Sequence, residues 1–197
     1  MKLIIATTNE GKLKEFRELF SGVGVELEGL QMFADLVEPV ETGDTFEANA
    51  MIKAREYARQ TGEWVLADDS GLEINALDGA PGVHSARFGG TSSNYGEKFR
   101  MILDLMQDSI DRTAKFVCVI AVARPDGEIA AKAIGECSGE IALSPRGSNG
   151  FGYDPVFAPE GHEHTFGEMT DDEKSALSHR SRAAKQIIHK MLDFIGV

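Results

Sequence analysis

The chain has 197 residues, 42% of them apolar, and a formal net charge of −12. This size predicts one sizeable core or two small lobes around one sheet, and the negative charge argues against a nucleic-acid groove or an anionic membrane surface as the partner. The longest apolar segment, around residues 116–123, is far too short to span a bilayer, and the N-terminal apolar run is too short for a signal peptide. We therefore expect a cytoplasmic protein that binds neither nucleic acid nor membrane.

Apolar patterning predicts regular elements along most of the chain. In chain order these are a strand over residues 2–7, a helix over 12–20, a strand over 25–30, a helix over 44–60, a strand over 63–69, an alternating stretch over 71–77 that could pair with a neighbouring segment, a helix over 93–106, a hairpin over 114–142 and two helical pieces over 170–197. Gly62 is expected to end the second helix, and Pro125-Asp126-Gly127 to form the hairpin turn. Two glycine-rich stretches, 78–90 and 144–161, are expected to be long loops. The sequence thus predicts an α/β chain with a mixed sheet.

The segment "TTNEGK" (residues 7–12) follows the first strand and opens the first helix. The first turn of a helix presents backbone N–H groups and the positive end of the helix dipole. Thr7 and Asn9 add neutral hydrogen-bonding groups, and Lys12 adds a cation, so the segment suits a phosphate. An ordinary turn with Asn9 as the N-cap is the alternative, because the P-loop pattern GxxxxGK[ST] is absent.

The stretch "VLADDSG" (residues 65–71) carries a buried strand directly into two adjacent aspartates. Burying two neighbouring anions is unfavourable unless a cation lies against them. Side chains alternate along a strand, so only one of Asp68 and Asp69 can enter a given cleft. With Glu41, that aspartate would supply the one or two carboxylates that Mg²⁺ prefers beside phosphate oxygens. A strand end capped by carboxylates and a solvated Glu41 remain the alternatives.

Two later segments offer groups for a flat, polar ligand. The loop "GSNGFGYDP" (residues 147–155) places Phe151, Tyr153 and Asp154 among glycines, where a ring can stack on a base and an acid can accept hydrogen bonds. "EKSALSHR" brings Lys174, His179 and Arg180 together, and cations in the first turn of a helix oppose its dipole. Local stability does not explain them, which favours an anionic or carbonyl-bearing ligand, although a packed loop remains the alternative for the first segment.

With these segments assembled, the chain resembles the HAM1-like inosine/xanthosine triphosphate pyrophosphatase family. The resemblance runs from residue 7 to residue 180 through "TTNEGK", "ETGDTFEANAMIKA", "ADDSGLEINALDGAPGVHSAR", "GFGYDPVF" and "EKSALSHR", in the order of the family. It implies an elongated, mixed, twisted β-sheet with flanking helices, forming two lobes of one domain (residues 1–197) around a nucleotide cleft. It also implies a homodimer that requires Mg²⁺.

The activity implied is hydrolysis of noncanonical purine nucleoside triphosphates (ITP, dITP, XTP) to the monophosphate and pyrophosphate. Asp69 would be the catalytic proton acceptor and, with Glu41, a metal ligand. The substrate-binding residues implied are Thr7, Thr8, Asn9, Glu10, Gly11, Lys12, Lys53, Ser70, Phe151, Gly152, Tyr153, Asp154, Lys174, His179 and Arg180. A phosphate-binding role for Arg87 is left open.

Two alternatives compete with this hypothesis. One is a Maf-type nucleotide pyrophosphatase with another base preference, which "SHR" and "FGYDP" disfavour. The other is a nucleotide-binding regulator without activity, which the presence of both Glu41 and Asp69 disfavours, because binding alone needs no carboxylate to take a proton from water.

Overall fold

The computed structural model of the protein describes residues 1–90 and 92–195. The strands are β1 (Lys2–Ile5), β2 (Glu26–Gly29), β3 (Trp64–Ile74), β4 (Thr113–Ala123), β5 (Ile129–Ile141) and β6 (Phe157–Pro159). The α-helices are α1 (Glu10–Leu19), α2 (Phe46–Thr61), α3 (Tyr95–Leu105), α4 (Asp171–Leu177) and α5 (His179–Ile195). Four short 3-10 helices are η1 (Leu30–Met32), η2 (Asn75–Leu77), η3 (Gly82–Arg87) and η4 (Asp154–Val156).

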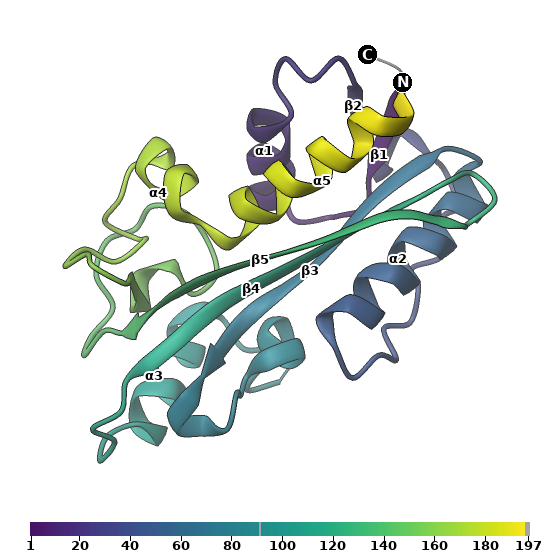
Figure 1. Cartoon of the computed structure of the whole chain (residues 1–197). Coiled ribbons are helices and arrows are strands. Elements are labelled where there is room, and N and C mark those ends of the chain that lie inside the picture. Colours follow the sequence, from purple (N-terminus) through teal and green to yellow (C-terminus); the bar gives the residue numbers. More distant parts are fainter. Residues whose placement is uncertain (91, 196–197) are drawn as a thin grey trace. The chain divides into compact units, whose positions relative to one another are not determined.

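The six strands form one sheet in the order β2-β1-β3-β4-β5-β6 (Figure 1). β1 pairs in parallel with both β2 and β3, whereas β5 and β6 are antiparallel. The prediction of an α/β chain with a mixed sheet is therefore confirmed. No helix among residues 1–90 and 92–195 is both long and apolar enough to cross a membrane.

The chain divides into two compact units. Unit 1 comprises residues 1–69, 118–135 and 180–197, and unit 2 comprises residues 70–117 and 136–179. β3, β4 and β5 contribute residues to both units. Each unit has its own core, and each is described by itself below.

The core of unit 1 follows from strand alternation. Leu3 and Ile5 of β1, Leu66 of β3 and alternate residues of β4 point toward α1 and α5, which supply Phe16 and Ala184 among others. These two helices lie on one face of this part of the sheet, and α2 lies on the other (Figure 1). Residues of β3 at even positions therefore face α1 and α5, and those at odd positions face α2.

The core of unit 2 is more aromatic. Phe116 of β4, Phe157 of β6 and Phe166 pack together, with ring centroids of Phe116 and Phe157 4.6 Å apart. Ile102 of α3 and Leu72 of β3 complete the buried cluster. This core supports the loop that leads into η4 and the helix α4.

The structure corrects three details of the sequence prediction. β3 does not end at the two aspartates but continues to Ile74. The stretch 78–90, expected to be a loop, contains η3, and the stretch 144–161 contains η4 and β6, because residues 157–159 pair with β5. The predicted C-terminal helix is α5, and residues 196–197 at its end lie outside the described residues.

Candidate active site

The segment between β1 and α1 is ordered by its own side chains. The Asn9 side chain accepts a hydrogen bond from the backbone N–H of Lys12 (3.1 Å), which makes Asn9 the N-cap of α1. The Thr7 hydroxyl accepts one from the backbone N–H of Asn9 (3.1 Å). These contacts fix the turn at the helix N-terminus, where the dipole favours an anion. Thr8, Glu10 and Gly11 lie in the same turn.

The side chain of Lys53 joins the two carboxylates that were predicted to bind metal. Its ammonium lies 2.7 Å from Oε1 of Glu41, which precedes α2, and 3.2 Å from Oδ1 of Asp69 in β3. Lys53 reaches them because it lies on α2, the helix that faces the odd-numbered residues of β3. The loop and the strand thus bring both carboxylates to one cation.

Burial and neighbouring charges shift the pKa values of this group. Burial opposes the charged ammonium of Lys53, but the attraction of Asp69, Asp68 and Glu41 outweighs it and raises the pKa of Lys53. Burial, with repulsion from Glu41, raises the pKa of Asp69 despite the nearby ammonium of Lys53. A carboxylate with a raised pKa is a stronger base, which suits a proton acceptor.

The two carboxylates fit a divalent cation. Oδ2 of Asp69 is buried and accepts no hydrogen bond from any described residue, so the structure leaves it available as a ligand. Among residues 1–90 and 92–195 no group of three or more His, Cys, Asp or Glu side chains is arranged to hold a metal. An ion here would therefore take two protein carboxylates and complete its shell with phosphate oxygens and water, as Mg²⁺ commonly does.

Asp68 points to the opposite face from Asp69, as strand alternation predicts. Its Oδ2 lies 2.9 Å from the ammonium of Lys12 and 3.3 Å from Nη2 of Arg180. Burial disfavours the charged form, but the attraction of Lys12 and then Arg180 outweighs it and holds the pKa of Asp68 well below its ordinary value. We call Lys12, Glu41, Lys53, Asp68 and Asp69 the lysine–carboxylate cluster; all five belong to unit 1.

Unit 2 contains a second buried ion pair. The ammonium of Lys174 on α4 lies 2.7 Å from Oδ2 of Asp154, and both side chains are almost fully buried. The same carboxylate oxygen accepts a hydrogen bond from the backbone N–H of Phe151 (2.7 Å), and the Lys174 ammonium lies 4.5 Å from the centroid of the Phe151 ring. The pair therefore fixes the backbone at Phe151 and sets a cation against its ring.

Glycines allow this loop to fold tightly around Asp154. Gly150 has φ +69°, and a Cβ there would lie 2.1 Å from Oδ2 of Asp154, so a larger residue cannot be accommodated. Tyr153 is buried and donates a hydrogen bond from its hydroxyl to the backbone carbonyl of Ser85 (2.8 Å). The imidazole of His179 stacks on Phe116 with centroids 4.6 Å apart.

The predicted site residues form two groups, one in each unit. Unit 1 holds residues 7–12, Glu41, Lys53, Asp69 and Arg180, and unit 2 holds Ser70, residues 151–154, Lys174 and His179. The lysine–carboxylate cluster contains four of the residues expected to bind phosphate or metal (Lys12, Glu41, Lys53 and Asp69), together with Asp68. Arg180, expected with His179 at the base end, has its guanidinium bonded to Glu15 and Asp68 in unit 1. Arg87 is the exposed last residue of η3.

Two residues that lie outside the site but contact the segments that carry it were missed in the sequence. Glu15 accepts a hydrogen bond from Nη1 of Arg180 at 2.5 Å, and Oδ1 of the buried Asn49 accepts one from the backbone N–H of Gly43 at 2.8 Å. Glu15 lies three residues after Lys12 and therefore on the same face of α1, and this spacing is a sequence signal that Glu15 lies near Lys12. Asn49 lies within the motif "ETGDTFEANA", one turn into α2, where it ties the Glu41 loop to the helix.

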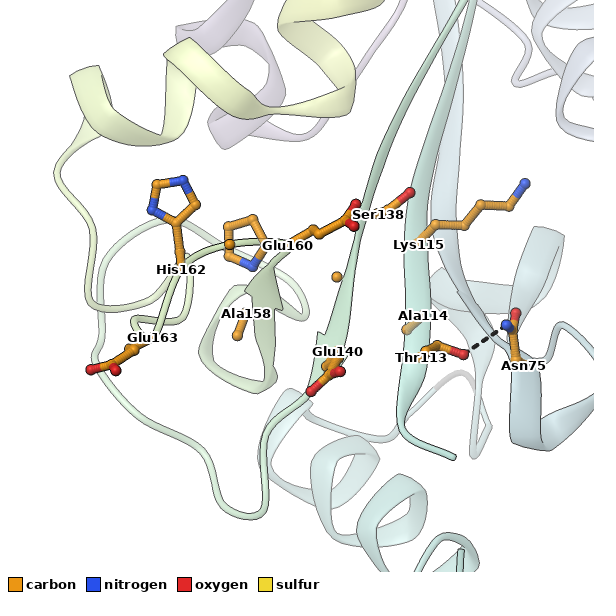
Figure 2. Close-up of a pocket in the computed structure, with 13 residues that line it drawn as sticks. Asn75, Thr113, Ala114, Lys115, Ser138, Glu140, Ala158, Glu160, His162 and Glu163 are labelled. Carbon is orange, nitrogen blue, oxygen red and sulfur yellow. Dashed lines mark hydrogen bonds between the residues drawn. The ribbon is translucent and has the colours of Figure 1, made fainter. Parts of the chain in front are cut away.

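A polar pocket in unit 2 is separate from both groups. This cavity of about 580 Å³ lies over β4, β5 and β6, and Figure 2 shows Glu140, Glu160 and Glu163 among its labelled residues. Its lysine, Lys115, is already paired with Glu136 at 2.8 Å. Carboxylates here would repel a polyphosphate, and no predicted site residue lines the pocket, so we place the nucleotide site elsewhere.

A model of a known protein family matches most of the chain. The family model described as "Ham1 family" matches residues 3–190. The chain belongs to the Ham1 family. The match covers every residue of both site groups, from the loop at Thr7 to the start of α5.

Relatives of this Ham1-family chain match it along nearly their whole length. A protein of Nostoc sp. named dITP/XTP pyrophosphatase is 47% identical and covers 96% of this chain and 93% of its own. One of the same name from Exiguobacterium sp. is 45% identical, with 99% of each chain covered. A solved HAM1 protein structure from Coxiella burnetii superposes with a TM-score of 0.90 at 40% identity, covering 98% of this chain and 99% of that one.

Proposed function

We propose that this Ham1-family protein hydrolyses noncanonical purine nucleoside triphosphates (ITP, dITP and XTP) to the monophosphate and pyrophosphate, removing them from the nucleotide pool. The observation that carries the proposal is the lysine–carboxylate cluster, in which Lys12 at the start of α1 pairs with Asp68 and Lys53 on α2 pairs with Glu41 and with Asp69, a carboxylate whose pKa is raised. Relatives at 45–47% identity carry the name dITP/XTP pyrophosphatase, which gives the substrate class.

The triphosphate is assigned to the turn at residues 7–12 with Lys12 and Lys53. Backbone N–H groups of the first helical turn and the hydroxyl of Thr7 offer neutral donors, and the two ammonium groups offset phosphate charge. The lysines are mostly buried and held by carboxylates, so their positions are set before substrate arrives. Such preorganisation favours stabilisation of charge that develops during the reaction.

Glu41 and Asp69 would hold Mg²⁺. When bound, the ion offsets the charge that develops on the pyrophosphate leaving group and lowers the pKa of a nearby water. The Asp69 oxygen that no described residue bonds, and the carboxylate of Glu41, which contacts the same Lys53 ammonium as Asp69, suit that role.

Asp69 is assigned the proton transfer. The oxygen of water bonds to the α-phosphorus as the bond from that phosphorus to the bridging oxygen of the β-phosphate breaks. The proton of the water passes to Asp69, whose raised pKa makes it a better acceptor than an exposed aspartate. Pyrophosphate departs with its charge facing Lys12 and Lys53.

The base is assigned to the residues of unit 2. Phe151 offers a ring for stacking, and Asp154, Lys174 and His179 offer polar groups fixed by the buried ion pair and by stacking on Phe116. Hypoxanthine and xanthine carry a carbonyl at C6, whereas adenine carries an amino group there. A buried donor that faces that amino group loses its partner, at about 1–3 kcal/mol for each donor. We also propose that the protein is a cytoplasmic homodimer.

A substrate panel tests the function. ITP, dITP, XTP, ATP, GTP and dTTP are each incubated with Mg²⁺, and pyrophosphate and orthophosphate are measured separately. We expect pyrophosphate from the first three alone. Preference for dTTP would support a Maf-type enzyme, which the Ham1 match does not favour; orthophosphate would indicate a stepwise phosphatase, and absence of product a nucleotide-binding regulator.

A further inference from the structure

Asp68 connects two parts of the chain that are far apart in sequence. Its Oδ2 meets the ammonium of Lys12 at 2.9 Å and Nη2 of Arg180 at 3.3 Å, and its side chain is only 1% exposed. Arg180 is separated from Asp68 by 112 residues and lies in the first turn of the last helix, α5, whereas Lys12 lies in the first turn of α1. One carboxylate oxygen thus holds a cation from each terminal helix.

A contribution to the stability of the fold does not explain this arrangement well. Buried ion pairs are often no more stabilising than well-packed apolar residues, because desolvation offsets the attraction between the charges. Arg180 also has a second carboxylate, since Nη1 bonds to Glu15 at 2.5 Å. The contact that distinguishes Asp68 from Glu15 is therefore the one to Lys12.

Lys12 needs such a contact if its position matters. A lysine ammonium is a point charge on a flexible four-carbon chain, so its location is fixed by what holds it. Asp68, which lies in β3, restrains this ammonium beside the N-terminus of α1. An ammonium group that is not held in place can still attract a polyphosphate, but it stabilises the charge of the transition state less well.

We propose that Asp68 is a positioning residue that fixes the Lys12 ammonium for the departing pyrophosphate, with Arg180 as the second cation that anchors Asp68. The effect on catalysis rests on the proposed function, whereas the restraint of Lys12 by Asp68 does not depend on it. Asp68 acts through Lys12 and takes no proton in the reaction, whereas its neighbour Asp69 faces the opposite side of β3.

The direct test measures Lys12 itself. Wild-type protein and the Asp68→Asn and Glu15→Gln variants are treated briefly with an amine-acetylating reagent, and modification of each lysine is quantified by peptide mass spectrometry. Lys14, exposed on the same helix, is the internal reference. We expect acetylation of Lys12 to become at least fivefold faster in Asp68→Asn and to stay within twofold in Glu15→Gln. Equal rates in all three proteins would overturn the proposal.

The kinetic test asks whether Asp68 acts through Lys12. With ITP and Mg²⁺, Asp68→Asn should lower kcat at least tenfold, while KM and the Kd for inorganic tripolyphosphate stay within about threefold. Glu15→Gln should keep kcat within threefold of wild type. In a Lys12→Met background, Asp68→Asn should have almost no further effect, since coupled residues are not additive. Additive losses, or an equal loss in Glu15→Gln, would contradict the proposal.

Folding and function are separated by two controls. Thermal melting identifies any variant that fails to fold. If Asp68→Asn does not fold, Lys12→Arg replaces it: the charge is kept but its reach to Asp68 changes, and a kcat within threefold of wild type would overturn the proposal. If wild-type protein makes no pyrophosphate from ITP, the proposed function fails, and acetylation of Lys12 still decides whether Asp68 positions it.

Discussion

The two units hold their buried charges in different ways. In unit 1, Lys53 is shared by Glu41 and Asp69, and Asp68 is shared by Lys12 and Arg180. In unit 2, the ammonium of Lys174 pairs with the carboxylate of Asp154, which also accepts a backbone N–H. The first arrangement is a network with a buried carboxylate oxygen of Asp69 that no described residue bonds, and the second is a buried ion pair packed against aromatic rings.

The difference fits two chemical tasks. A network of shared charges can exchange one cation for another, as binding of a metal and a charged polyphosphate requires. A buried ion pair packed against aromatic rings keeps one geometry, which suits the shape of a flat, neutral base. Mutations should therefore affect turnover and metal dependence in unit 1, and stability and substrate selection in unit 2.

The largest expected effect is on stability, in unit 2. Lys174→Met leaves the carboxylate of Asp154 buried without its ammonium, which should lower the free energy of unfolding by about 3–5 kcal/mol. Urea denaturation measures this loss. Lys115→Met is the matched control, because Lys115 pairs with glutamates at the surface of the same unit and should cost less than about 1 kcal/mol. Equal losses would show that burial of the Asp154–Lys174 pair does not set it apart from a surface pair.

The next effect is on turnover, in unit 1. Asp69→Asn removes the proton acceptor and a metal ligand, so kcat for ITP at saturating Mg²⁺ should fall by about 100-fold or more, with a smaller change in KM. Glu47→Gln, an exposed carboxylate at the start of α2, is the control and should leave kcat unchanged. A kcat for Asp69→Asn within a fewfold of wild type would rule out the assigned role.

A smaller effect is expected where the Glu41 loop meets α2. A Cβ on Gly43 would lie 2.6 Å from Cβ of Ala48 and 2.7 Å from Oδ1 of Asn49, so Gly43→Ala must move the loop. The Mg²⁺ concentration for half-maximal activity should rise about threefold to tenfold, with the ranking of substrates unchanged. Gly62→Ala, at the other end of α2, should reduce stability by about 1 kcal/mol through its left-handed φ of +69° and leave the Mg²⁺ response unaltered. A Mg²⁺ response in Gly43→Ala equal to wild type would separate this loop from the metal.

The smallest effect tests the caps of the helices that carry the two lysines. Thr170 caps α4, which bears Lys174, and Thr45 caps α2, which bears Lys53. Replacing either threonine with alanine should cost about 1 kcal/mol, measured by urea denaturation. A loss well above 2 kcal/mol at one cap alone would mean that its helix depends on the cap more than on tertiary packing.

The sequence by itself determined the local structure. Apolar spacing predicted β1, α1, α2, α3 and the β4–β5 hairpin, because a helix or strand shows its buried face in its own residues. Cap residues act in the same local way: Gly62 ends α2 in the left-handed conformation, as predicted, and Thr170 and Glu173 form a capping box at the start of α4. The motifs, read together and in order, also indicated the family that the comparison later identified.

Only the tertiary structure decided how the charges are satisfied. Two adjacent aspartates suggested the end of a strand, yet β3 continues through them because Lys12, Lys53 and Arg180 meet their carboxylates from three helices. β6 likewise exists because β5 offers it an edge, which its three residues do not signal. Hydrophobic periodicity can be recognised from residues that are neighbours in the sequence. The partner of a buried charge can lie tens of residues away, so only the folded chain shows which carboxylate pairs with which cation.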